Sequence, residues 1–176
     1  MGVYESRINA GRILAKTHPV DADLVVGVPE SGNPAALGFS LESGIPYGNA
    51  FIKNNYVGRT FIKPKQAQRE SSVKVKLNVL KEAVAGKRVV MIDDSIVRGT
   101  TSARIVSLLK NSGAKEVHVR PACPPIMFGC KYLNFARFKS EMDLISRRII
   151  CDFEGTDEVS LEVLQEYADP DSDKYK

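Results

Sequence analysis

Cysteine is scarce and unpatterned in this chain of 176 residues. The three cysteines, Cys123, Cys130 and Cys151, are an odd number and form no CxxC pair. That argues against both a disulfide framework and a complete zinc site. The sequence also lacks an apolar run long enough to cross a membrane, and no signal peptide opens it. We therefore expect a cytoplasmic protein with reduced thiols and no membrane partner.

Histidine is equally rare, which bears on the chemistry that the chain can perform. The only two histidines, His18 and His118, have no serine or cysteine at a spacing typical of a catalytic triad. We interpret both as structural. A nucleophilic serine or cysteine hydrolase is therefore not predicted.

The charged residues are unevenly distributed. Residues 1–151 carry 23 Lys and Arg against 12 Asp and Glu, a balance of +11, whereas residues 152–176 carry 2 against 9, a balance of −7. We accordingly divide the chain into a basic domain, residues 1–151, and an acidic C-terminal segment, residues 152–176. The basic residues are scattered and no nucleic-acid motif is present, so a small polyanion is the simpler predicted partner.

Periodicity predicts an α/β fold with a mostly parallel sheet flanked by helices. The apolar content of 43% is sufficient for a core, and the length suits one domain. Strands are expected at Asp23–Pro29, Val89–Ile92 and Glu116–Ala122. Helices are expected over residues 3–17, 35–42, 73–84, 138–151 and 161–167, and also after residue 101, where apolar residues recur at helical spacing.

The stretch Arg88–Thr101 is the most informative part of the chain. Val89–Ile92 is a short apolar run typical of a strand buried on both faces. Asp93 and Asp94 end it, and a turn containing Ser95, Arg98, Gly99, Thr100 and Thr101 leads into the helix. The pattern places this loop at the carboxyl end of a parallel strand, where open α/β sheets bind ligands.

The residue types in this loop indicate what it binds. Backbone N–H groups at a helix N-terminus, a glycine and two threonine hydroxyls suit a phosphate dianion. Asp93 and Asp94 would repel a phosphate, so vicinal sugar hydroxyls or a divalent metal are their expected partners. Together these preferences suggest a ribose 5-phosphate. The alternative is an ordinary capped helix after an acidic strand end.

Residues 93–102, Asp-Asp-Ser-Ile-Val-Arg-Gly-Thr-Thr-Ser, resemble the phosphoribosyl pyrophosphate (PRPP) motif of type I phosphoribosyltransferases. The sequence of this motif is similar to that of the glutamine PRPP amidotransferases, a family of enzymes of purine synthesis. The resemblance implies the type I fold with a mobile flap. It also implies that Asp93 and Asp94 hold the ribose hydroxyls and assist Mg²⁺, while Ser95, Arg98, Gly99, Thr100 and Thr101 hold the 5-phosphate.

A second loop of this kind follows the first expected strand. Glu30-Ser31-Gly32-Asn33-Pro34 precedes a helix rich in small residues. From the residues alone, an ordinary turn with Asn33 as N-cap and a phosphate-binding loop are both open. The resemblance implies a pyrophosphate loop, with Ser31 near the metal.

Residues 52–81 carry eight Lys and Arg against one acid, Glu70. This composition suits either a solvated surface loop or a flap that covers a polyanion. The resemblance implies the flap, with Lys53, Tyr56 and Arg59 as substrate contacts. Asn55 stands where that family has an arginine.

The resemblance also bears on cofactors and on completeness. In one branch of the family, a cysteine at the place of Cys130 is one ligand of a [4Fe–4S] cluster, so we expect that cluster only in a longer protein. A glutaminase half with its nucleophilic cysteine has no counterpart here. We expect a phosphoribosyltransferase-domain fragment.

The resemblance implies that PRPP and ammonia give 5-phosphoribosylamine and pyrophosphate. In the full enzymes glutamine supplies the ammonia, purine nucleotides inhibit, and the protein is a homo-oligomer. Two alternatives stay open. A salvage-type purine phosphoribosyltransferase would need a base-reading segment, for which Phe135 and Phe138 are the only candidates. A PRPP-binding regulator without catalytic activity would need a nucleic-acid motif.

Overall fold

The computed structural model of the protein describes residues 2–53, 77–129 and 140–174. In chain order the first elements are α1 (Val3–Thr17), β1 (Leu24–Gly27), α2 (Asn33–Ser43), β2 (Phe51–Lys53), β3 (Leu77–Val79) and α4 (Lys81–Val84). They are followed by β4 (Arg88–Asp93), α5 (Thr100–Asn111), β5 (Glu116–Pro121), the 3-10 helix η3 (Glu141–Asp143), α6 (Ile145–Glu154) and α7 (Leu161–Ala168). Contacts divide the chain into an N-terminal unit, Met1–Asp94 with Ser102–Cys123, and a C-terminal unit, Ser95–Thr101 with Pro124–Lys176.

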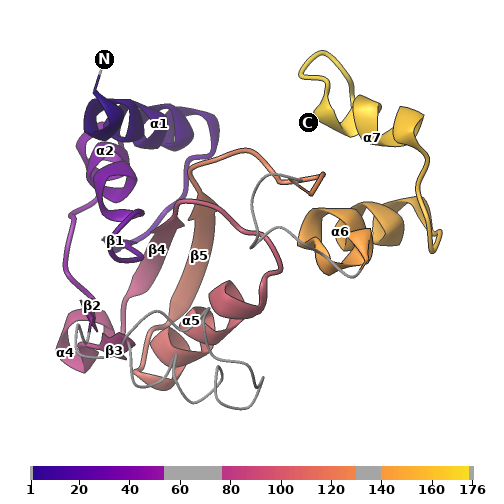
Figure 1. The fold of residues 1–176 in the computed structure, drawn as a ribbon. Helices are drawn as coiled ribbons and strands as arrows, with labels where there is room; N and C mark the ends of the chain where they lie inside the picture. Colours follow the sequence, from indigo (N-terminus) through magenta and orange to yellow (C-terminus); the bar gives the residue numbers. More distant parts are fainter. Residues whose placement is uncertain (1, 54–76, 130–139, 175–176) are drawn as a thin grey trace. The chain divides into compact units, whose positions relative to one another are not determined.

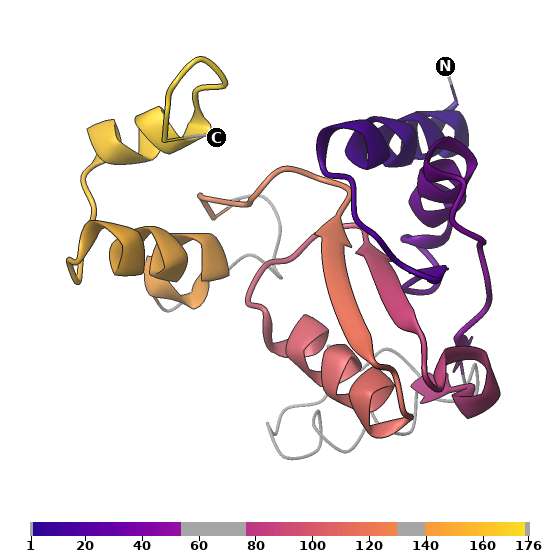
Figure 2. The same cartoon turned by 180° about the vertical axis from the view of Figure 1, so that it is seen from behind.

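A parallel sheet of order β1-β4-β5 forms the centre of the N-terminal unit. Val89 and Met91 of β4 face one core cluster, which includes the buried side of α5. Val90 and Ile92 face the other, which includes Phe39 of α2. Figures 1 and 2 show α5 on one face of the sheet and α1 and α2 on the other. Helices cover both faces of the sheet, which explains why Val89–Ile92 within β4 is an unbroken apolar run. The predicted α/β architecture is confirmed.

Two glycines allow α1 and α2 to pack closely over their face of the sheet. A Cβ on Gly11 would lie 1.9 Å from the carbonyl oxygen of Ala35, and one on Gly38 would lie 2.0 Å from that of Ile8. Each glycine therefore lies directly against the backbone of the other helix. This contact fixes α2, and hence the loop that precedes it, relative to α1.

The predicted helix over residues 73–84 is wrong. In its described part, residues 77–84, Leu77–Val79 is strand β3, which pairs antiparallel with β2, and Lys81–Val84 is helical. The sequence from Val73 to Val79 alternates apolar and polar residues without a break, which is the period of a strand. The alternation was a local signal that the helix prediction overlooked.

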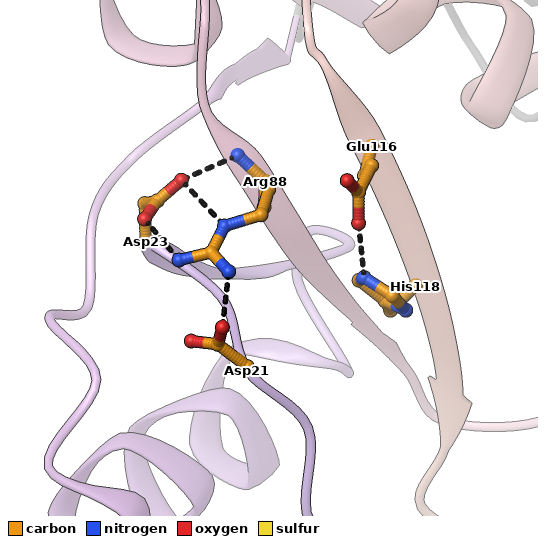
Figure 3. Close-up of polar contacts among 5 residues, drawn as sticks. All are labelled: Asp21, Asp23, Arg88, Glu116 and His118. Carbon is orange, nitrogen blue, oxygen red and sulfur yellow. Dashed lines mark hydrogen bonds and ion pairs between the residues drawn. The ribbon is translucent and has the colours of Figure 1, made fainter.

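Ion pairs hold the amino ends of the central strands. Asp23, which precedes β1, accepts hydrogen bonds from the backbone N–H and the guanidinium of Arg88 at 2.8 to 3.2 Å. Asp21 pairs with the same guanidinium (Figure 3). The pairing with Arg88 lowers the pKa of Asp23 from its ordinary value to about 2. On the neighbouring strand His118 Nε2 lies 3.3 Å from a carboxylate oxygen of Glu116.

The C-terminal unit is organised around a buried arginine. Arg147 of α6 donates from Nε to the Met127 carbonyl at 2.8 Å, and its Nη2 lies 2.7 Å from a Glu141 carboxylate oxygen. Its guanidinium also lies 5.0 Å from the ring centre of Phe128. The helix predicted over residues 138–151 is replaced by η3 and a later α6. Within the three described ranges, no helix has the length and apolar content needed to cross a bilayer.

Candidate active site

The loop between β1 and α2 packs against the carboxyl end of β4. The N–H of Val28 donates to the Ile92 carbonyl at 2.8 Å, and the N–H of Gly32 donates back to the Val28 carbonyl at 3.0 Å. A Cβ on Gly32 would lie 2.5 Å from the Ile92 oxygen, so no other residue fits there without displacing the loop. The loop that contains Ser31 therefore lies beside the end of the strand that carries the acid pair.

This edge of the sheet is a topological switch point. β1 leads through α2 to Tyr47, which forms a parallel bridge with Val25, and α2 lies on one face. β4 leads through α5 to β5 on its other side, and α5 lies on the opposite face. Connections that leave in opposite directions open a crevice at the carboxyl ends of two adjacent parallel strands, which is where such sheets bind ligands.

Asp93 and Asp94 stand at that edge. Asp93 is the last residue of β4 and is only 8% exposed, and its Oδ1 accepts a hydrogen bond from the Asp94 N–H at 2.9 Å. The carbonyls of both acids accept hydrogen bonds from the chain after β5, at 2.8 and 3.0 Å. Burial, with the nearby charge of Asp94, raises the pKa of Asp93 to about 6. At neutral pH the buried, ionised carboxylate of Asp93 would be stabilised by hydroxyl donors or by a cation.

The turn Ser95–Thr101 follows directly and belongs to the C-terminal unit. Gly99 has φ +76°, a left-handed conformation that suits glycine. Thr100 and Thr101 open α5, so their backbone N–H groups lie in its first turn, where no intrahelical acceptor is available. The guanidinium of Arg98 lies 3.7 Å from the carboxylate of Asp143. The turn that the sequence predicted to bind a phosphate therefore leads directly into the first turn of a helix.

Lys53 is brought to the loop of Ser31. It ends β2, and its Nζ lies 3.0 Å from a carboxylate oxygen of Glu30. Sequence reasoning did not identify Glu30 as the partner of Lys53, because 23 residues separate them and only the tertiary fold joins them. The other two predicted flap contacts, Tyr56 and Arg59, lie outside the described residues, as does Cys130.

The described residues provide no ready-made metal cage around the acid pair. Among the described residues, no three His, Cys, Asp or Glu side chains come together as metal ligands. A cavity of about 230 Å³ lies in the C-terminal unit, lined by Ser140, Glu141, Met142, Arg147, Glu158 and Val159. None of these is a predicted site residue, and the wall mixes opposite charges with apolar groups. The arrangement at the strand ends is therefore the stronger candidate.

Comparison with known proteins shows the family of the chain. Residues 8–122 match the family model of the phosphoribosyl transferase domain. The chain belongs to this family. The matched residues include the loop after β1 and the loop after β4.

The domain is similar to amidophosphoribosyltransferases in particular. It is 58% identical to that of Synechocystis over 130 residues, which are 74% of the domain and 26% of the relative. It is also 58% identical to that of Methanocaldococcus jannaschii over 132 residues, 75% of the domain and 28% of the relative. The chain thus spans just over a quarter of these two curated relatives, and the predicted family is confirmed.

Solved structures extend the likeness to almost the whole chain. The glutamine PRPP amidotransferase of B. subtilis, complexed with ADP and GMP, is 45% identical with a TM-score of 0.71. The match covers 98% of this chain and 39% of that one. A structure of the allosteric regulatory enzyme of purine biosynthesis matches at 45% identity and a TM-score of 0.72. The predicted fold class is confirmed.

Proposed function

We propose that this domain transfers the phosphoribosyl group of PRPP to ammonia, giving 5-phosphoribosylamine and pyrophosphate as a step of purine synthesis. The observation that carries the proposal is the Asp93–Asp94 pair at the carboxyl end of the buried central strand. A buried carboxylate in that place is unfavourable for stability, so a ligand that satisfies it is the simplest reason for its presence. The vicinal hydroxyls of ribose are such a ligand.

Each part of PRPP has a proposed partner. Asp93 and Asp94 accept hydrogen bonds from the two ribose hydroxyls. The turn of Ser95, Arg98, Gly99, Thr100 and Thr101 binds the 5-phosphate through backbone N–H groups and hydroxyls. The pyrophosphate is assigned to the loop of Ser31 and to Lys53, with Tyr56 and Arg59 as further predicted contacts.

The same residues suit Mg²⁺. Asp93 and Asp94, with the hydroxyl of Ser31, are hard oxygen donors of the kind this ion prefers. Because so few protein ligands gather there, oxygens of PRPP and water would complete the coordination. When bound, Mg²⁺ would neutralise negative charge on the pyrophosphate leaving group.

The reaction requires little from the protein beyond position and charge. The bond between C1 of the ribose and the pyrophosphate oxygen breaks, and its electron pair leaves with pyrophosphate. The lone pair of ammonia forms the new C1–N bond, and the nitrogen then loses one proton to water. Positive charge develops on the ring between these events. The carboxylates of Asp93 and Asp94 hold the ring in place and stabilise that charge.

Further proposals concern the longer enzyme of which this chain would be a part. We propose that glutamine supplies the ammonia in a full-length cytoplasmic enzyme, which is a homo-oligomer and is inhibited by purine nucleotides. The complex of the B. subtilis relative with ADP and GMP supports the last point. Cys130 remains a predicted single ligand of a [4Fe–4S] cluster in the proposed full-length enzyme.

The test is release of pyrophosphate from PRPP with Mg²⁺, with and without ammonium, at mildly alkaline pH. The unsubstituted chain, Asp94→Asn and Asp157→Asn are compared, since Asp157 is an exposed acid outside the proposed site. We expect ammonium-dependent release that Asp94→Asn abolishes and Asp157→Asn retains. Absence of both release and PRPP binding in the unsubstituted chain would refute the proposed function.

A further inference from the structure

The turn that follows the acid pair is hydrogen-bonded to the start of α6. The backbone N–H of Ile145 donates to the carbonyl of Val97 at 2.9 Å. The guanidinium of Arg148, one turn further along α6, donates from Nη2 to the carbonyl of Arg98 at 2.6 Å. Two consecutive carbonyls of the turn are therefore held by one helix that begins almost fifty residues later. All four residues belong to the C-terminal unit.

Holding the carbonyls also fixes the direction of the donors. In the described part of the chain the one cis peptide bond is Pro29–Glu30, so the peptides 97–98 and 98–99 are trans. In a trans peptide the N–H points away from the C=O of the same plane. Because the Val97 and Arg98 carbonyls point to α6, the N–H groups of Arg98 and Gly99 point away from it. Those two N–H groups are among the donors assigned to the 5-phosphate.

Side-chain contact reinforces the same arrangement. Gly99 has φ +76°, and a Cβ there would lie 2.5 Å from Cδ1 of Ile145. The side chain of Ile145 thus packs directly on the glycine that follows the carbonyl bound by Arg148. Asp143, just before α6, lies 3.7 Å from the Arg98 guanidinium. Residues 143–148 thus contact the turn at three places: its backbone carbonyls, Gly99 and the side chain of Arg98.

We propose that Arg148 is a positioning residue for the 5-phosphate, acting with the backbone N–H of Ile145. This inference rests on the proposed function, because it assigns a purpose to the turn that binds the phosphate. A cation bound to the Arg98 carbonyl polarises the 98–99 peptide and strengthens the Gly99 N–H as a donor. Arg148 orients and strengthens this donor without having to touch the substrate.

The first test separates the two ends of PRPP by ligand. Affinities for ribose 5-phosphate and for Mg²⁺-pyrophosphate are measured by calorimetry for the unsubstituted chain, Arg148→Gln and Arg148→Lys. Arg12→Gln is the charge-matched control, since Arg12 is an exposed arginine of α1. Loss of one charge-assisted hydrogen bond at an exposed position predicts about three- to tenfold weaker binding of ribose 5-phosphate by Arg148→Gln. Pyrophosphate affinity should not change, and Arg148→Lys should recover part of the loss.

The second test removes the backbone donor alone. Ile145 is the first residue of α6, a position where proline is tolerated, and Leu144 before it is extended at φ −77° and ψ 127°. Ile145→Pro therefore deletes the N–H to Val97 without interrupting the helix, while Ile145→Ala removes side-chain volume and keeps the N–H. We expect Ile145→Pro to bind ribose 5-phosphate more weakly than Ile145→Ala.

The outcomes are distinguishable. Failure of the unsubstituted chain to bind either PRPP or ribose 5-phosphate would overturn the proposed function, and this inference with it. PRPP binding with ribose 5-phosphate affinity unchanged in Arg148→Gln would overturn the inference alone. Equal losses for ribose 5-phosphate and pyrophosphate would also overturn it, because they would indicate general loosening of the fold. A loss confined to ribose 5-phosphate, with recovery by lysine, would support it.

Discussion

Replacing Asp93 with asparagine should make the fold more stable at alkaline pH while abolishing PRPP binding. The substitution is nearly isosteric, and an asparagine oxygen can still accept the hydrogen bond that Asp93 Oδ1 takes from the Asp94 N–H. The change therefore removes a buried negative charge and little else. If Asp93 served to stabilise the fold, its replacement by asparagine would instead make the fold less stable.

The magnitude follows from the pKa of Asp93, which burial and Asp94 raise from 3.8 to about 6. The folded state holds its proton more tightly than the unfolded state, so it binds more protons between about pH 4 and pH 6, and stability falls as pH rises through that window. At 1.36 kcal/mol per pKa unit, the full penalty above pH 6 is at most about 3 kcal/mol. The Asp93→Asn chain carries no such penalty at any pH, because its amide does not ionise.

The assay is urea unfolding of the unsubstituted chain and Asp93→Asn at a series of pH values, without divalent cations that would neutralise the site. The two chains should agree below about pH 4, where Asp93 is protonated in both states, and diverge up to about pH 6. Asp94→Asn should retain most of the penalty, because burial is the larger cause of the shift. If Asp93→Asn were the less stable chain at pH 8, this reasoning would be refuted.

Three further results are expected. Gly38→Ala should lower the free energy of unfolding by about 3 kcal/mol, because its Cβ would overlap the backbone of α1, whereas Gly2→Ala, whose Cβ meets nothing within 4 Å, should change little; urea unfolding compares them. Asp23→Asn should destabilise the fold at neutral pH. Because the folded-state pKa of Asp23 is lowered to about 2, that difference should vanish as pH falls from about 4 through 2 in acid titrations followed by circular dichroism. Glu30→Gln should tighten Mg²⁺-pyrophosphate binding up to about fivefold, because it frees Lys53 from an exposed ion pair and removes a repelling charge. Calorimetry showing weaker binding would instead mean that Glu30 holds Lys53 in its working position.

The parts of the fold that sequence predicted well are those whose signal is local. β4, α1 and the loop and helix after Asp94 follow from apolar runs, helical spacing and turn residues within a few positions of one another. Strand β3 was missed although residues 73–79 alternate, because a helical interpretation was extended across them. Local spacing also cannot show which distant strand a segment pairs with, so the β2–β3 pairing needed the structure.

The candidate site likewise has features that the sequence could predict and features that it could not. The acid pair and the turn after it could be recognised from their residue types, whereas the contacts that orient them could not. Arg148 binds the Arg98 carbonyl across fifty residues of chain, and nothing about an arginine on the polar side of a helix marks it as such a partner. The orientation of the peptide N–H and C=O groups in this turn depends on contacts with α6. Because α6 is distant in the sequence, the residues next to the turn do not reveal that orientation.

The two ends of β4 show how the environment shifts the pKa of an aspartate in opposite directions. At the amino end Asp23 faces the guanidinium of Arg88, and its pKa is lowered to about 2. At the carboxyl end Asp93 is buried beside a second acid, and its pKa is raised to about 6. The pKa values of two identical side chains thus shift in opposite directions, because Asp23 has a countercharge, whereas Asp93 is buried and lies beside a like charge. The first arrangement stabilises the fold above pH 4 and the second destabilises it above pH 6. A destabilising acid at the end of the sheet where the connections diverge is the kind of feature that the proposed ligand site would explain.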